Sequence, residues 1–248
     1  MSIQTEEELH GLKRVGRIVA LALEEMRKHL KAGMTTRELD EIGQRFLEKH
    51  KAKSAPKLTY NFPGATCISI NDEVAHGIPG DRAIQPGDLV NLDVSAELNG
   101  LFADTGATFP VSPVSDLQRR LCATARRALR KAVAVVRTDA KFNRIGRVIE
   151  EEAHASGFEV IRNLFGHGVG RGLHEEPEEV ANFYDVQDQR RMTEGLVFTI
   201  EPMLTTGARF AVEDRDGWTM RTEDGSLVVQ YEHTVVATKR GALVLTQA

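Results

Sequence analysis

The sequence contains little cysteine. Cys67 and Cys122 are the only two in 248 residues, too few for a disulfide scaffold, which agrees with a reducing compartment. Their separation also excludes a Cys-x-x-Cys metal site. A transition metal bound by this chain must therefore be held by His, Asp and Glu, and those residue types become the candidates for a functional site.

Long apolar runs and clusters of basic charge are also absent. Residues 1–14 are acidic and polar, without the apolar core of a signal peptide, and no later stretch reaches the ~18 apolar residues of a membrane span. The formal net charge is −4, and the basic residues are spread along the chain, so no phosphate-backbone footprint is indicated. We therefore expect a cytoplasmic protein that binds neither membranes nor nucleic acid directly.

The composition is that of an ordinary globular protein. With 41% apolar and 27% charged residues, the chain is long enough to bury a sizeable core. No Pro-rich, poly-Ser or charge-run linker divides it. We predict a single domain that spans residues 1–248.

Capping boxes mark the starts of helices. In such a box a Ser or Thr and a Glu or Gln three residues later satisfy free backbone amides at the helix start. Apolar residues at helical spacing follow each box, and the first of these patterns stops at Gly33. A further helical pattern, without a box, runs from residue 142 to about 156. The boxes pair Thr5 with Glu8, Thr35 with Glu38, and Ser115 with Gln118.

Between the helical segments the pattern indicates strands. From about residue 66 to 110 the apolar period falls toward two, with Pro-Gly and Asn-Gly turns, and strands return at Val160, at 196–200 and at 227–237. The order helix, helix, strands therefore occurs twice. We predict an α+β domain built from two similar halves, about 1–112 and 113–248, around a shared sheet.

A hairpin signal brings two acids together. Asn99-Gly100 between alternating runs favours a two-residue turn, which places Asp93 and Asp104 diagonally on one face, roughly 7–8 Å apart at the backbone. The opposite face is apolar. Converging carboxylates repel unless positive charge lies between them, which metal ions would supply. For this pair alone, the more favoured alternative is that Asp104 caps a turn and Asp93 faces water.

The second half supplies further candidates. His167 and His174 lie in a glycine-rich segment, residues 165–177; Glu201 ends an apolar strand before a proline, and Glu232 lies within an apolar β run. Taken singly, such a His is more often a satisfied polar group and such a Glu often lies on a solvated edge. Together, the acids and His167 form an oxygen-rich set with one imidazole. That composition suits a pair of Mn, Fe, Co or Zn ions.

Six motifs occur in order along nearly the whole chain. They are NDEVAHGIP at 71–79, NLDV at 91–94, ADTG at 103–106, GHGVGRGLHEEP at 166–177, TIEPM at 199–203 and QYEHT at 230–234. Together they resemble the motifs of type I methionine aminopeptidases. The resemblance implies the α+β pita-bread fold, in which two pseudo-two-fold-related halves enclose a metal site within a curved, mainly antiparallel sheet. Leu173 departs from the pattern where bacterial members have an aromatic residue, and Val228 departs where a Ser is usual.

The resemblance also implies a ligand set for two divalent metal ions per chain, with Co, Mn, Fe(II) or Zn as candidates. Matched motif by motif, Asp93 would bind one ion, and His167 and Glu201 the other. Asp104 and Glu232 would bridge both.

Catalytic and substrate-binding roles follow from the same matching. Glu201 would accept the proton of the attacking water. His174 would hydrogen-bond the scissile carbonyl or its oxyanion, and His76 would contact the substrate amide on the leaving-group side. The positions that line the family's methionine pocket are Tyr60, Phe62, Cys67 and Trp218.

The implied activity is hydrolysis of the initiator methionine from nascent proteins whose second residue is small, through a water activated by two metals. We expect a monomer that works near the ribosome. One alternative is a proline-specific aminopeptidase on the same fold, although those usually carry a large extra N-terminal domain and this chain begins the first half at once. The other alternative is a metal-free binding protein on this fold. All five ligand positions are filled here, which argues against it, and metal analysis of the purified protein would decide.

Overall fold

The helices begin where the capping boxes predict. In the computed structural model, which describes residues 1–247, the side chains of Thr5, Thr35 and Ser115 each accept the predicted amide, and the reciprocal bond is present in every case. The first helix is capped at Leu30, slightly before the predicted stop at Gly33. The helices are α1 (Glu6–His29), α2 (Thr36–Lys49), α3 (Ala55–Tyr60), α4 (Asp116–Val135) and α5 (Asn143–Ala155). Among the described residues, no helix combines the length and apolarity that a membrane crossing requires.

The strands are β1 (Lys53–Ser54), β2 (Cys67–Ile70), β3 (Glu73–Ala75), β4 (Leu89–Leu98), β5 (Leu101–Pro110), β6 (Glu159–Val160), β7 (Gly166–Gly168), β8 (Glu175–Val180), β9 (Val197–Ile200), β10 (Met203–Thr205), β11 (Ala211–Glu213), β12 (Met220–Thr222), β13 (Val228–Gln230), β14 (His233–Thr238) and β15 (Gly241–Val244). The predicted blocks contain β2 to β6, β9, β13 and most of β14, whereas β1, β7, β8, β10 to β12 and β15 lie outside them. The pairings between these strands are antiparallel.

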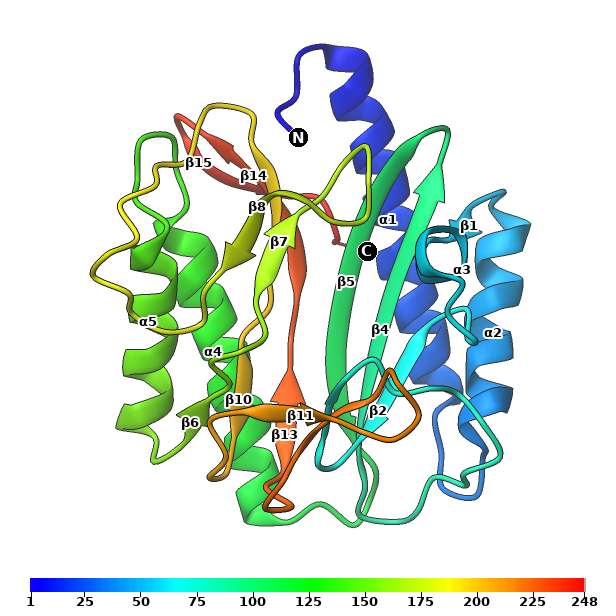
Figure 1. Cartoon of the computed structure of the whole chain (residues 1–248). Helices are drawn as coiled ribbons and strands as arrows, with labels where there is room; N and C mark the ends of the chain where they lie inside the picture. Colours follow the sequence, from blue (N-terminus) through cyan, green and yellow to red (C-terminus); the bar gives the residue numbers. More distant parts are fainter. Residues whose placement is uncertain (248) are drawn as a thin grey trace.

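Two larger sheets carry the centre of the molecule. One has the order β1-β4-β2 with β5 also paired to β4, and the other has the order β15-β14-β9-β7-β8. Smaller sheets with the orders β13-β10-β6 and β11-β12-β3 complete the set. In Figure 1, α1 and α2 lie on one side of the central strands and α4 and α5 on the other. The predicted α+β architecture with repeated helix-helix-strand order is confirmed.

The two halves join where β5 runs beside β13 and β14. Ala107 and Tyr231 form a β-bridge there. The Thr234 hydroxyl donates to the carbonyl oxygen of Asp104 at 2.7 Å, and the amide of Asp104 donates to the Thr234 hydroxyl oxygen at 3.0 Å. The segments that carry Asp104 and Glu232 are therefore fixed against each other at the molecular centre.

Each helix pair covers its own apolar core. One core packs α1 and α2 against the apolar face of β4, with residues such as Leu92 and Val94 fully buried. The other packs α4 and α5 against strands of the second half, around Phe198 and Ile145. Apolar burial on the helix side leaves the opposite face of the central strands for polar side chains.

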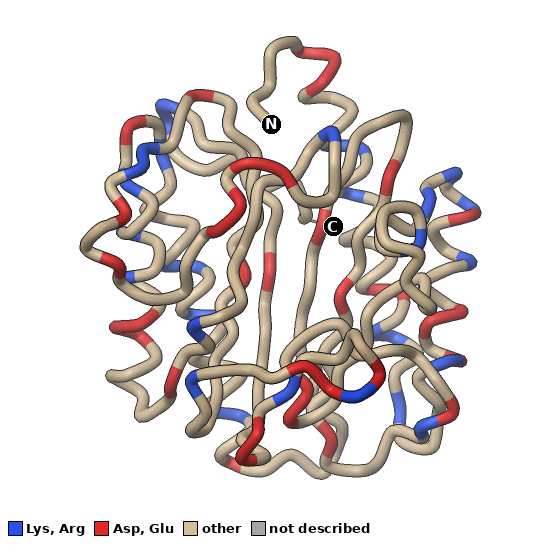
Figure 2. Tube along the Cα trace, in the orientation of Figure 1, with Lys and Arg blue, Asp and Glu red and all other residues tan. Residues whose placement is uncertain are grey.

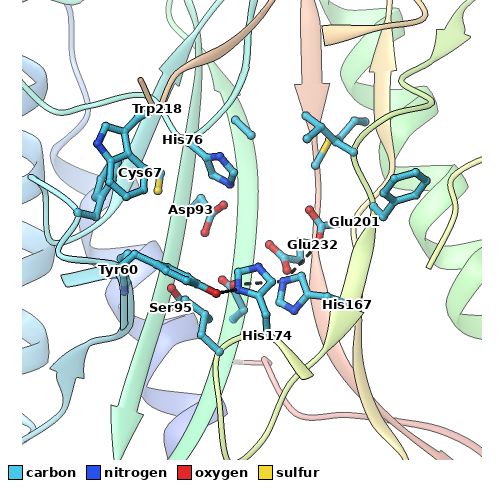
Figure 3. Close-up of a pocket in the computed structure, with 18 of the residues that line it drawn as sticks. Tyr60, Cys67, His76, Asp93, Ser95, His167, His174, Glu201, Trp218 and Glu232 are labelled. Carbon is cyan, nitrogen blue, oxygen red and sulfur yellow. Dashed lines mark hydrogen bonds and ion pairs between the residues drawn. The ribbon is translucent and has the colours of Figure 1, made fainter. Parts of the chain in front are cut away.

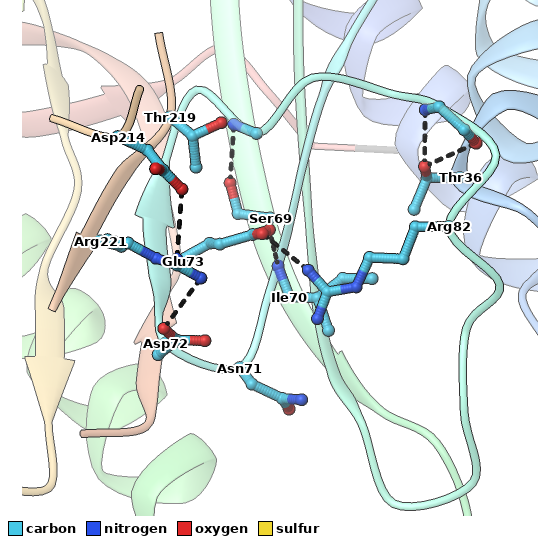
Figure 4. A network of polar contacts seen from close by, with 12 residues as sticks. Thr36, Ser69, Ile70, Asn71, Asp72, Glu73, Arg82, Asp214, Thr219 and Arg221 are labelled. Atoms are coloured by element: carbon cyan, nitrogen blue, oxygen red, sulfur yellow. Dashed lines mark hydrogen bonds and ion pairs between the residues drawn. The ribbon is translucent and has the colours of Figure 1, made fainter. Parts of the chain in front are cut away.

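A polar network holds together two loops at one end of the molecule (Figure 4). The guanidinium of Arg221 contacts the carboxylates of Asp72 and Asp214, each at 3.2 Å. Arg82 pairs with Glu73 at 2.6 Å, and β3 pairs with β12. The β2–β3 turn with β3 and the β11–β12 hairpin, which come from different halves, are thereby tied to one another.

Candidate functional site

The predicted hairpin forms with the predicted register. Asn99 and Gly100 have φ values of 54° and 80°, the left-handed conformation that a type I′ turn needs at both positions. Asp93 lies opposite Gly106 in the β4–β5 pairing, so Asp104 is its diagonal neighbour on the same face. The convergence of these acids is therefore set by the turn and by the period of two along each strand.

The second half brings its candidates to the same place. His167 lies at the middle of β7, Glu201 directly follows β9, and Glu232 lies in the break between β13 and β14 rather than inside one continuous strand. Asp104, His167 and Glu232 each offer a ligand atom, and these atoms lie within 4.8 Å of one another. The Nε2 atom of His167 lies 3.7 Å from Oε1 of Glu201 and 3.9 Å from Oδ2 of Asp104.

Asp93 lies at the edge of this group. It is not one of the residues in the tightest cluster, but its carboxyl adjoins that of Asp104 and lines the same cavity. Figure 3 places it on the side of the site nearer Cys67, its partner across the β2–β4 pairing. Asp104 therefore adjoins both Asp93 and the tightest cluster of ligand atoms.

The buried carboxyls strongly perturb one another. Burial, followed by the charges of neighbouring carboxylates, raises the pKa of Asp93 and of Glu232 well above the ordinary values. Burial raises the pKa of Asp104 to about 6, and burial with the charge of Asp104 raises the pKa of Glu201 to about 8. Burial also lowers the pKa of His167 to about 3, so its ring is neutral at neutral pH. The site therefore disfavours its own accumulated negative charge.

These residues fit divalent metal ions. Oδ1 of Asp104 and Oε1 of Glu232 are buried and accept no hydrogen bond from the described part of the chain. The residues that line the cavity include neither Lys nor Arg, and Figure 2 shows acidic positions on the central strands. Buried carboxylate oxygens without partners are costly, and metal cations would compensate them. Carboxylates with one neutral imidazole suit Mn, Fe, Co or Zn.

Thr199 orients the histidine and one of the acids. The amide of His167 donates to the Thr199 hydroxyl oxygen at 2.9 Å, and the hydroxyl donates to Oε1 of Glu201 at 2.9 Å. Thr199 was not among the predicted site residues. A signal was available, because Thr199 lies in β9 two positions before Glu201, so the alternation of the strand turns both side chains to one face.

Gln230 supports Glu232 in a similar way. Its Nε2 donates to Oε2 of Glu232 at 3.1 Å, and its Oε1 accepts from Nδ2 of Asn91 at 2.8 Å. Gly106 makes room for this side chain, because a Cβ there would lie 2.3 Å from Oε1 of Gln230. Gln230 and Asn91 were also missed, although each lies two positions before a predicted ligand, Glu232 and Asp93.

Two further histidines face the same cavity, which has a volume of about 400 Å³. His76 lines it with φ of +56°, a left-handed conformation that is uncommon for His and is concentrated at functional positions. The ring of His174 lies 4.0 Å from that of His167, centroid to centroid. Tyr60 hydrogen-bonds Nδ1 of His174 through its hydroxyl at 2.6 Å (Figure 3).

The rest of the cavity wall is largely apolar and aromatic. Phe62 and Trp218 pack edge to face with ring centroids 5.1 Å apart, and the thiol of Cys67 is buried beside them. Leu173 also lines the cavity, whereas Tyr60 lies at its margin with 44% of its surface exposed. The structure thus gathers every site residue that the sequence indicated around one cavity.

Comparisons with known proteins agree with this geometry. The model of metallopeptidase family M24 matches residues 10–239. A protein of Bacillus subtilis named methionine aminopeptidase 2 is 46% identical over 248 residues, which cover all of both chains.

Solved structures show the same similarity. A methionine aminopeptidase from Thermotoga maritima superposes with a TM-score of 0.96 at 34% identity, with complete coverage of both chains. A prolidase from Pyrococcus furiosus gives a TM-score of 0.77 at 23% identity; 99% of this chain and 65% of the prolidase are covered. The likeness to the prolidase therefore concerns the fold alone.

Proposed function

The chain belongs to metallopeptidase family M24, and we propose on that premise that it removes the N-terminal methionine from proteins and peptides whose second residue is small. Full-length similarity to proteins named methionine aminopeptidase supports the activity. The observation that carries the proposal is one cavity with two unlike ends. Acids and His167 crowd one end, and the other offers an apolar wall of Phe62, Cys67 and Trp218, whose aromatic faces and sulfur suit a thioether.

As a metallopeptidase, the chain uses divalent metal ions, whose identity stays open. We propose that Asp93, Asp104, His167, Glu201 and Glu232 would hold these ions. The support is the mutual proximity of these groups and the unpartnered oxygens of Asp104 and Glu232. When bound, such ions act as Lewis acids and lower the pKa of water.

The remaining roles belong to side chains around the ligands. Cations held by the ligand set would keep the carboxyl of Glu201 ionised, and in that form it would accept the proton of the water that attacks the peptide carbonyl, because it borders both His167 and the cavity. His174 donates a hydrogen bond to the carbonyl oxygen as negative charge develops on it. His76, on the opposite side of the cavity in Figure 3, contacts the departing amide.

The organisation of the protein is part of the proposal. Residues 1–248 form one catalytic domain with halves of about 1–112 and 113–248, each with its own helix pair and core. We place the protein in the cytoplasm as a monomer that meets new polypeptides near the ribosome. The support for the location is the substrate class, the N-terminal methionine of proteins, which the names of full-length relatives indicate.

A cleavage assay on Met-Ala-Ser, Met-Leu-Ser and Ala-Pro-Ser peptides tests the proposal. Chelator-stripped enzyme is supplied with each divalent metal in turn, and Met-Ala-Ser should be cleaved far faster than the other two. A preference for Ala-Pro-Ser would assign the chain to the proline-specific relatives. If no metal binds and no peptide is cleaved, the chain is a metal-free binding protein.

A further inference from the structure

Tyr60 and His174 meet across the cavity from different halves of the molecule. Tyr60 is the last residue of α3, and His174 follows β7, 114 positions later. The Tyr60 hydroxyl lies 2.6 Å from Nδ1 of His174, and the ring centroids are 5.5 Å apart. Figure 3 shows this bond at the side of the cavity where His174 and His167 adjoin.

The end of α3 holds the Tyr60 side chain in this direction. Asn61 caps the helix in the left-handed conformation, with φ of 56°, and its amide donates to the carbonyl oxygen of Lys57 at 3.2 Å. The amide of Phe62 donates to the carbonyl oxygen of Pro56, also at 3.2 Å. The backbone therefore reverses directly after Tyr60. Phe62 turns to Trp218 while Tyr60 turns to His174.

The bond is compatible with one form of the His174 ring that presents a proton to the cavity. Partial burial raises the pKa of Tyr60, so its hydroxyl keeps its proton at neutral pH and can donate it to Nδ1. A neutral imidazole that accepts at Nδ1 carries its proton on Nε2. Within residues 1–247, no hydrogen bond to Nε2 is found, and the ring lines the cavity. In this form, Nε2–H is available to a bound substrate.

We propose that Tyr60 is a positioning residue that holds His174 as the Nε2–H tautomer and aims this donor at the carbonyl oxygen of the bond to be cleaved. The target of the donor rests on the proposed function, whereas the bond and the tautomer do not. This role differs from contact with the methionine side chain, which the family resemblance implied for Tyr60. The two roles have different kinetic consequences.

Tyr60→Phe removes the hydroxyl and keeps the ring. Loss of one aligning hydrogen bond should lower kcat for Met-Ala-Ser by about 2- to 10-fold, with little change in KM and no loss of bound metal. Tyr184→Phe is the matched control, because it removes a hydroxyl from a ring that packs against Arg147 away from the cavity. An effect of Tyr60→Phe on KM alone would indicate that Tyr60 contacts the methionine side chain, and it would overturn the proposal.

The tautomer itself is measured by NMR on zinc-loaded protein labelled with ¹⁵N at histidine, with His174→Gln to assign the signal. The wild type should show Nδ1 of His174 as a non-protonated acceptor and Nε2 as protonated. Tyr60→Phe should shift the Nδ1 signal, and Tyr184→Phe should leave it in place. A protonated Nδ1 in the wild type, or an unchanged signal in Tyr60→Phe, would refute the assignment. If the shift occurs but no methionine peptide is cleaved, the proposed function fails and the tautomer assignment stands.

Discussion

Gly106→Ala perturbs the metal site without touching a ligand. Gly106 has no side chain and no positive φ, so alanine fits the backbone conformation there. The new Cβ would lie 2.3 Å from Oε1 and 3.0 Å from Nε2 of Gln230. Ordinary contact begins at about 3.4 Å, so the amide of Gln230 must move away by about an ångström.

That movement breaks the support of Glu232. Gln230 is 3% exposed and bonds Asn91 at 2.8 Å and Glu232 at 3.1 Å, so a shift of this size loses both hydrogen bonds. Buried groups left unsatisfied cost about 1–3 kcal/mol, which for a chain of this length lowers Tm by roughly 2–4 °C per kcal/mol. Loss of an outer-shell partner typically weakens metal binding about 10- to 100-fold.

Calorimetric titration of chelator-stripped protein with Mn or Co measures the affinity, and a thermal melt measures stability. Gly80→Ala is the matched control, since its Cβ would meet nothing within 4 Å. In a Gln230→Ala background the obstacle is gone, and Gly106→Ala should add little. Wild-type metal affinity in Gly106→Ala would refute the reasoning that Gln230 positions Glu232.

Other changes test separate parts of the account. His174→Ala should keep bound metal and lower kcat by roughly 10²–10³, the usual cost of an oxyanion donor; an unchanged kcat removes that role. His76→Ala should lower turnover with metal retained, whereas a loss of Tm alone makes His76 a loop brace. Burial alone would raise the pKa of Glu152, but bonds from Lys131 and Arg127 lower it. Glu152→Gln should therefore cost about 1–2 kcal/mol in denaturant at pH 7, and the difference should shrink as pH falls below about 4.3; a constant difference contradicts the ion pair.

Local signals account for the parts of the fold that could be predicted. Capping boxes depend on residues three apart, and the hairpin register depends on Asn99-Gly100, so both are visible in short stretches of sequence. α3 was not predicted, because its six residues are too short to display a helical period. The interruption between β13 and β14 at Glu232 was not predicted either. It depends on the amide of Glu232 donating to the carbonyl oxygen of Gly106 at 2.8 Å, a contact between distant segments.

The candidate site divides in the same way. Its ligands stood out because acids within apolar strands are unusual. The groups that support them, Thr199, Gln230 and Asn91, are neutral polar residues without such contrast, and their roles depend on side-chain geometry. Tyr60 and His174 are 114 positions apart in the sequence, so no local pattern predicts their contact.

The central claim is that the clustered acids and His167 form a catalytic metal centre. The most direct test titrates chelator-stripped enzyme with metal and follows bound metal and Met-Ala-Ser cleavage together. We expect no cleavage without metal and recovery with Co, Mn or Fe(II). Asp104→Asn should bind less metal and cleave more slowly, while the exposed Asp81→Asn should match the wild type. Full cleavage by metal-free enzyme, or wild-type stoichiometry and rate in Asp104→Asn, would contradict this assignment.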